Sequence, residues 1–326
     1  MFAVDTTFVV DQRHTQADLR YLFHLLGIMG LDELSDDTAV PGLSREKAYQ
    51  SLAPLPPLET QKRIAAFLDE KTARIDALIA KKQALLERLA EKRQAIITRA
   101  VTKGLNAAAP MKDSGIDWLG QIPAHWEVIK IKFATSHVVD CLHTTPTYDG
   151  DLIYPAIRTA DVDRGVLLLD QARLVSQEVY DERIQRLKPV EGDVLYSREG
   201  ERFGMAALVP PNIPLCLGQR MMMFRVVERF SPAYVMWTLN SDFIYQQVVV
   251  EAGGSTSPHV NIGDVINFPI LNPPLREQCE IAEFIEEQRI YIEKMSEKVA
   301  ASIAKLTEYR AALITAAVTG QIEGLR

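Results

Sequence analysis

Two stretches of the chain, 58–101 and 275–318, carry the apolar pattern of long amphipathic helices. Neither contains proline or glycine, and strong helix formers dominate both. In the second stretch an apolar row recurs at the heptad spacing of a coiled-coil seam, at Ile285, Ile292, Val299, Leu306 and Leu313. The first stretch repeats the row at Leu68, Ile75, Leu89 and Ile96, interrupted by Lys82. Because a single helix cannot bury such a seam, each helix needs the other or a partner's helix.

The two helical stretches are copies of one another. Pro56 falls on Pro273 at an offset of 217 residues, the difference between 273 and 56, and the match then runs without a gap. Of the 47 pairs aligned in this way, 20 are identical. A period of this length is the size of a domain, which indicates a duplication rather than a short-repeat solenoid.

The segment between the helices, 114–270, has a different pattern. Short β-rich runs at 126–133, 193–196 and 221–227 are separated by turn signals, and a helical stretch covers 232–250. This mixture predicts an α+β fold class, with a mixed α/β domain added to the two long helices.

Composition narrows the class of protein. The chain has 326 residues, 47% of them hydrophobic and 24% charged, which is enough for two domains of ordinary size. Its three cysteines lie far apart without a CxxC or Cys/His cluster, so neither a disulfide framework nor a zinc site is expected. The chain does not open on a secretory signal pattern, and no apolar run reaches the roughly 18 residues of a membrane span. We therefore expect a soluble, cytoplasmic protein with no membrane partner.

The chain is acidic overall, with a formal net charge of −7. Segment 114–270 is itself acidic, with 13 Lys+Arg against 19 Asp+Glu. This balance argues against a protein that coats nucleic acid through a basic surface. The objection is weaker for a subunit of an assembly, because partner chains can neutralise phosphates while this chain reads bases.

Several motifs resemble those of one family. Segment 114–128, SGIDWLGQIPAHWEV, resembles the opening of a target recognition domain in type I restriction-modification specificity subunits. Segments 192–195 and 197–200 and the turn at 254–256 resemble landmarks inside that domain. The PPLxxQ pattern occurs at both positions where the family has its spacer helices. The order of these motifs, together with the duplication, extends the resemblance over essentially the whole chain.

The resemblance implies a non-catalytic DNA-specificity subunit, with no cofactor or metal site of its own. Two target recognition domains, held apart by an antiparallel coiled coil of the long helices, would each read one part of a split double-stranded DNA site. Modification (methyltransferase) subunits and restriction subunits would be its partners, and a homodimer is a further possibility. We expect a remnant of the first recognition domain at 1–55, spacer helices at 56–105 and 273–322, and a complete second recognition domain at 106–272.

The first copy of the duplicated unit is expected to lack its beginning. Upstream of its helix, Pro41 falls on Pro258 and, after a one-residue slip, Phe8 falls on Phe224. Residues 1–55 then correspond only to the tail of a recognition domain, and we expect them to be unable to read DNA. Apolar residues of this tail should be exposed, rearranged or covered by another chain: Phe2, Phe8, Leu22, Phe23 and Leu26.

Basic side chains on loops of the domain are the candidates for DNA contact. Any of them could reach a base edge or a phosphate, although a solvated surface role is commoner for such side chains: His143, Arg158, Arg198, Arg202 and Arg220. Arg198 and Arg202 flank a glycine in a short loop after the predicted strand 193–196, so this loop could approach a DNA groove closely.

Two other functions remain open. The tetrapeptide at 272–275, NPPL, resembles the one with which adenine-specific DNA methyltransferases hold a flipped base, but its aromatic member is missing. No glycine-rich cofactor loop follows a strand, and no carboxylate constellation indicates a nuclease. A coiled-coil scaffold that binds only proteins would suit the acidic charge, but it would explain the helices and not the domain.

Overall fold

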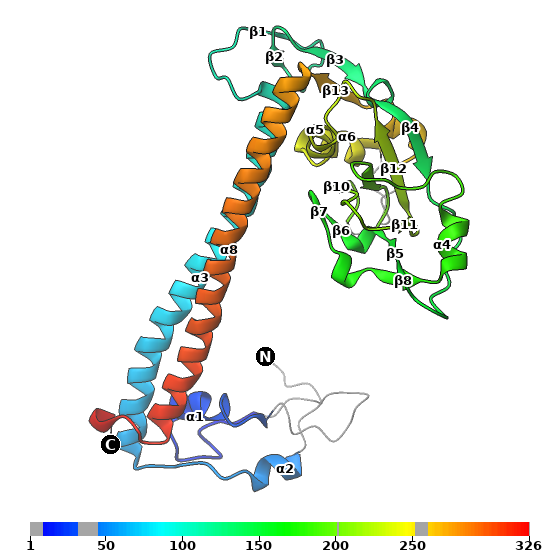
Figure 1. Cartoon of the computed structure of the whole chain (residues 1–326). Helices are drawn as coiled ribbons and strands as arrows, with labels where there is room; N and C mark the ends of the chain where they lie inside the picture. Colours follow the sequence, from blue (N-terminus) through cyan, green and yellow to red (C-terminus); the bar gives the residue numbers. More distant parts are fainter. Residues whose placement is uncertain (1–8, 32–44, 201, 252–259, 326) are drawn as a thin grey trace. The chain divides into compact units, whose positions relative to one another are not determined.

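The computed structural model of the chain describes residues 9–31, 45–200, 202–251 and 260–325 (Figure 1). It divides into two compact units, Met1–Leu89 with Lys294–Arg326, and Ala90–Glu293. The long helices α3 (Leu58–Lys103) and α8 (Leu275–Val318) each contribute one end to each unit. Both long helices predicted from the sequence are therefore confirmed.

Helices α3 and α8 pack against each other in antiparallel orientation. In the first unit the beginning of α3 and the end of α8 share one buried cluster, which contains Ile64, Ala65, Leu68, Ile314, Ala317 and Val318. In the second unit the end of α3 and the beginning of α8 share another, which contains Ile97, Ala100, Val101, Ile281, Ala282 and Ile285. An ion pair between Arg310 Nε and Asp76 Oδ1, at 2.8 Å, joins the helices in the first unit. Pairing in this direction buries part of each seam, with Leu68, Ile75 and Leu89 buried on α3 and Ile285 and Ile292 on α8. The predicted antiparallel coiled coil is confirmed.

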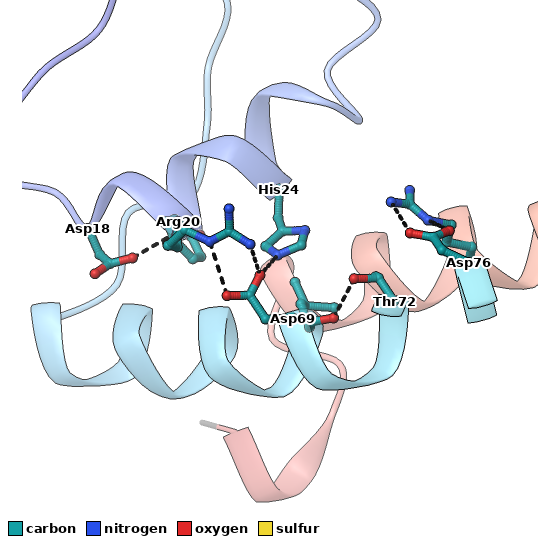
Figure 2. A network of polar contacts seen from close by, with 9 residues as sticks. Asp18, Arg20, His24, Asp69, Thr72 and Asp76 are labelled. Atoms are coloured by element: carbon teal, nitrogen blue, oxygen red, sulfur yellow. Dashed lines mark hydrogen bonds and ion pairs between the residues drawn. The ribbon is translucent and has the colours of Figure 1, made fainter. Parts of the chain in front are cut away.

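The first unit adds two short helices, α1 (Leu19–Leu26) and α2 (Arg45–Gln50). The carboxylate of Asp18 caps α1 by accepting the backbone N–H of Tyr21 at 2.9 Å. Arg20 and His24 of α1 both reach Asp69 of α3, at 3.0 Å from Arg20 Nε to Oδ2 and 2.9 Å from His24 Nε2 to Oδ1 (Figure 2). The hydrogen bonds from Arg20 hold the pKa of Asp69 below its usual range, so this carboxylate stays ionised. Helix α1 is thus fixed to α3 by a charged contact beside the apolar cluster.

The second unit is a mixed α+β domain, as predicted for 114–270. Its four-stranded antiparallel sheet has the order β10 (Ala206–Leu208), β9 (Val194–Ser197), β12 (Met221–Val226) and β4 (Thr135–Asp140). Another sheet has the order β11 (Cys216–Leu217), β5 (Tyr154–Ile157) and β8 (Arg173–Val175), with β11 parallel to β5. The described residues also form antiparallel pairs of β1 (Met111–Asp113) with β2 (Gln121–Pro123), β3 (Glu127–Lys130) with β13 (Pro269–Asn272), and β6 (Val162–Asp163) with β7 (Val166–Leu167).

Short helices pack on these sheets: α4 (Gln177–Arg183), α5 (Pro232–Leu239), α6 (Asp242–Glu251) and α7 (Ile262–Val265). The helical stretch predicted at 232–250 is divided into α5 and α6 at Asn240. The side chain of Asn240 accepts from the backbone N–H of Ala206 at 3.0 Å and donates to its carbonyl at 2.9 Å. Because this pairing ties the end of α5 to strand β10, the helix stops there instead of continuing into α6.

The turn between β6 and β7 shows how tightly α5 is enclosed. Gly165 has a φ of +81°, and a Cβ atom at this position would lie 2.3 Å from the ring of Trp237 on α5. Glycine is therefore required here for two reasons, its backbone conformation and the missing side chain. The core of the unit lies around α5, whose residues 234–239 are all buried.

The duplication reappears in the way each long helix is joined to a shorter helix earlier in the chain. Gln61 of α3 accepts the backbone N–H of Asp18 at 2.8 Å and donates to the carbonyl of Pro56. Gln278 of α8 accepts the backbone N–H of Ser231 at 2.9 Å and donates to the carbonyl of Pro273 at 2.8 Å. Asp18 and Ser231 are the N-caps of α1 and α5, so the two glutamines make the same contacts in the two copies.

Two tyrosines extend this correspondence. Tyr21 of α1 donates its hydroxyl to the carbonyl of Pro54 at 2.8 Å, and Tyr234 of α5 donates to the carbonyl of Leu271 at 3.1 Å. Both carbonyls lie just before a long helix. Helix α1 is therefore the counterpart of α5, at an offset of 213 residues, the difference between 234 and 21.

The counterpart helices differ in how much of their surface is covered. Phe23 and Leu26 of α1 are 60% and 38% exposed, whereas the corresponding Met236 and Leu239 of α5 are 3% and 0% exposed. Leu22 is half-buried. The expected exposure of apolar residues thus occurs at Phe23 and Leu26. The other residues named for it, Phe2 and Phe8, lie outside the described residues, as do Pro41 and Pro258 of the upstream match.

Candidate nucleic-acid interface

Three of the five candidate DNA contacts meet at one place on the second unit. His143, Arg198 and Arg220 line a pocket of about 220 Å³, together with Glu199 and Gln219. The pocket lies where β4, β9 and β11 end, so three separate segments of the chain build it. A neighbouring hollow adds Asp140 and Asn261 to this polar surface.

Arg198 is the buried member of this group. Its side chain is 5% exposed, and its Nε and Nη2 atoms lie 3.1 and 3.3 Å from the two carboxylate oxygens of Asp140. Nη1 lies 3.3 Å from Oε1 of Glu199. The guanidinium therefore joins the end of β4 to the end of β9 and anchors the site. A DNA contact by Arg198 would require it to leave Asp140, and the prediction of such a contact stays a prediction.

His143 and Arg220 are the exposed members. Their side chains are 72% and 56% exposed, and each retains one acidic partner: His143 Nε2 lies 3.1 Å from Asp140, and Arg220 Nε lies 3.3 Å from Glu199. Arg220 has a φ of +63°, an uncommon left-handed conformation for a residue other than glycine. Its carbonyl accepts the backbone N–H of Arg198 at 3.2 Å, which stabilises that conformation.

Arg158 and Arg202 lie apart from the pocket, on neighbouring loops. Arg158 is 26% exposed and makes a two-pronged ion pair with Asp161, at 3.0 Å from Nε and 2.8 Å from Nη2. These hydrogen bonds raise the pKa of Arg158 above its ordinary value. Arg202 donates from Nη1 to the carbonyl of Val162 at 3.3 Å and is 35% exposed. Both arginines are thus engaged in contacts within the domain.

No pattern in the sequence indicated the residue that fixes the two loops of the site. Arg183, at the end of α4, is 7% exposed and donates to the carbonyl of Leu217 at 3.1 Å and to the carbonyl of Thr144 at 2.6 Å. One side chain therefore holds the loop after β4 and the last residue of β11, where the loop to β12 begins. Arg186 adds a bond to the carbonyl of Asp140 at 3.1 Å. A pattern search could not find these bonds, because both acceptors are backbone atoms more than thirty positions away.

The part of the chain that the structure describes offers little support for a metal site, a cysteine nucleophile or a membrane span. There, no group of three or more His, Cys, Asp or Glu side chains is placed to hold a metal ion. Burial raises the pKa of the Cys216 thiol to about 12 and also raises that of Cys141, so neither is a ready nucleophile. Among the described residues, every helix is too short or too polar to span a lipid bilayer.

Fold and site together define a class of protein: a domain with rigid polar loops, joined to a duplicated pair of antiparallel helices. No family model matches the chain. The specificity subunit of type I restriction enzyme MjaVIII from Methanocaldococcus jannaschii is 24% identical over 288 residues, which are 85% of this chain and 65% of that protein. The EcoBI specificity subunit from Escherichia coli is 24% identical over 331 residues, with 96% of this chain and 68% of that protein covered.

The fold has a solved relative. A chain from a structure that addresses complex assembly and conformational transition of a type I restriction-modification system matches with a TM-score of 0.69 at 18% identity, covering 93% of this chain and 71% of that one. The resemblance to type I specificity subunits inferred from the sequence is thus confirmed, and so is the fold class. The chain spans about two thirds of the length of the curated relatives it matches.

Proposed function

We propose that this chain is a DNA-specificity subunit of a type I restriction-modification complex and reads part of a bipartite DNA site without catalysing any step. The observation that carries the proposal is the polar site formed by the loops after β4 and β11. His143 and Arg220 face solvent there, while Arg183 holds the backbone of the loop after β4 at Thr144 and the start of the loop after β11 at Leu217. Loops held in this way lose little conformational entropy on binding, which favours selective contacts with base edges.

The segments of the chain receive distinct roles in this proposal. Residues 106–272 form the complete target recognition domain, and 56–105 and 273–322 form the spacer helices. Residues 1–55 form the tail of another recognition domain. This last assignment is supported by the equivalence of α1 and α5, which make the same contacts with the glutamines of their long helices.

Within the recognition domain, Arg220 is assigned the contact with a base edge. A guanidinium can donate two hydrogen bonds to O6 and N7 of guanine in the major groove. His143, which lines the same pocket, is assigned to a base or phosphate at the same place. Arg158 and Arg202 are assigned to phosphates, because an arginine already paired with a carboxylate can still donate a further hydrogen bond.

The proposed partners are double-stranded DNA, modification (methyltransferase) subunits and restriction subunits. With a net charge of −7, the chain depends on partner subunits for much of the phosphate neutralisation. Apolar side chains exposed on the long helices support the docking of partner helices: Leu78 and Leu85 on α3, and Ile290 and Tyr291 on α8.

A homodimer is included in the proposal, with α1 at its interface. Phe23 and Leu26 expose apolar surface that the counterpart helix α5 buries, so a second chain would gain stability by covering it. Light scattering over a range of concentrations tests this. The wild-type chain should dimerise, whereas the Phe23→Ser/Leu26→Ser double variant should remain monomeric. A monomeric wild-type chain at all concentrations contradicts the homodimer.

The proposed function is tested by selecting DNA from a pool of randomised duplexes with the chain assembled with its modification subunits, which supply the missing phosphate neutralisation, at two salt concentrations. The wild-type chain should enrich a defined motif. Arg220→Ala should weaken discrimination at one position by about 1–3 kcal/mol if the contact is to a base, or flatten the salt dependence if it is to a phosphate. Arg276→Ala, at a residue whose side chain is 90% exposed on α8, is the matched control and should leave the motif unchanged. Failure to enrich any motif contradicts the proposed function.

A further inference from the structure

The loop between β11 and β12 holds one residue, Gln219, in a nearly fixed position. Before it, the N–H of Gly218 donates to the carbonyl of Ile157 at 2.6 Å, and a Cβ atom on Gly218 would lie 2.7 Å from that oxygen. After it, Arg220 has a left-handed backbone conformation and accepts from Arg198. The peptide that carries Gln219 is thus pressed against β5 on one side and tied to β9 on the other. Its half-buried side chain lines the polar pocket.

The amide of Gln219 is oriented by the neighbouring loop. Its Nε2 donates to the hydroxyl oxygen of Thr145 at 2.7 Å. Thr145 follows Thr144, whose carbonyl accepts from Arg183. The hydroxyl that receives the amide is therefore on a backbone segment that is itself held in place. This contact joins the two loops of the site by side chains, in addition to the backbone contacts made by Arg183.

The contact with Thr145 uses one of the two N–H groups of the Gln219 amide. The second N–H and the carbonyl oxygen Oε1 remain chemically able to bind a ligand. One donor beside one acceptor, on a planar amide, matches the N7 acceptor and the N6 donor that adenine presents in the major groove. Guanine and thymine lack a donor at the corresponding positions, and cytosine lacks the acceptor.

We infer that Gln219 reads an adenine in the half-site recognised by this domain, and that Thr145 positions its amide for that contact. The inference rests on the proposed function. It adds a specificity-determining residue and a base to the site, beside the contacts assigned to Arg220 and His143. A single replacement should then alter the preference at one position of the motif and leave the other positions intact.

The decisive variant is Gln219→Glu in the same selection from randomised duplexes. A carboxylate accepts but does not donate, so the preference at one position should change from adenine towards cytosine, whose N4 is a donor. Gln219→Ala should make that position degenerate, with roughly ten-fold or greater loss of discrimination. Thr145→Val should weaken the preference for adenine at the same position without replacing it by another base. Gln121→Ala, an exposed glutamine on β2, is the matched control and should keep the wild-type motif.

The outcomes separate this inference from the function on which it rests. If the wild-type chain enriches a motif that Gln219→Glu and Gln219→Ala leave unchanged, the inference is wrong and the proposed function stands. The inference is also wrong if the altered position was not adenine in the wild-type motif, or if both variants only lower binding evenly across all sequences. The last result would give Gln219 a purely structural role. If the wild-type chain enriches no motif, the proposed function fails, and the inference fails with it.

Discussion

Replacing Gln278 by alanine should destabilise the second unit more than the equivalent change at Gln61 destabilises the first. Gln278 is fully buried, and its amide satisfies the N–H of Ser231 and the carbonyl of Pro273. Alanine would leave both backbone groups buried without a partner, at about 1–3 kcal/mol for each group. We therefore expect Gln278→Ala to lower the free energy of unfolding by about 2–6 kcal/mol. At Gln61 both contacts are partly accessible to water, which can replace the lost partner, so we expect about 1–2 kcal/mol.

Tryptophan fluorescence can distinguish the two units. The three tryptophans, Trp118, Trp126 and Trp237, all lie in the second unit. In guanidinium unfolding followed by fluorescence, Gln278→Ala should shift the transition to lower denaturant, and Gln61→Ala should shift it little. Far-UV circular dichroism, which reports on α3 and α8 in both units, should respond to both variants. A fluorescence shift below about 0.5 kcal/mol for Gln278→Ala, or equal shifts for the two variants, would refute the reasoning.

Three further predictions follow from contacts elsewhere in the chain. Gly165→Ala should destabilise the second unit by about 2–4 kcal/mol in the fluorescence assay, because its Cβ meets the Trp237 ring and its φ is positive; an unchanged transition contradicts this. Arg183→Leu should lower the free energy of unfolding by about 2–3 kcal/mol and abolish motif enrichment, because the carbonyls of Leu217 and Thr144 lose their buried donor. An Arg183→Leu variant that still enriches the wild-type motif contradicts this prediction. Hydrogen bonds from Arg20 lower the pKa of Asp69 in the folded state. The stability that the Asp69 carboxylate contributes is therefore present above its unfolded pKa of about 3.9 and is lost as pH falls through the lower folded pKa. Circular dichroism at decreasing pH should show this loss of stability, and the Asp69→Asn variant should not show it.

The sequence by itself determined the long helices and their relationship. Heptad spacing, the absence of proline and glycine and the 217-residue repeat are local or periodic signals, and they predicted α3 and α8 as duplicated helices that need a partner helix. Their antiparallel pairing was implied by the family resemblance. Buried seams can be recognised in this way because a helix places residues three, four and seven positions apart on one face. The family resemblance was also available from the order of motifs along the chain.

The tertiary structure decided which side chains form the site and which are already engaged. Sequence spacing suggested that Arg198 and Arg202 share one exposed loop, but Arg198 is buried against Asp140, whereas Arg220, twenty-two positions after Arg198, is exposed beside the same pocket. The roles of Arg183 and Thr145 were invisible because their partners are backbone or side-chain atoms from distant segments. An arginine's role depends on which carboxylates and carbonyls the fold brings within about 3 Å of it, and no local pattern encodes those distances.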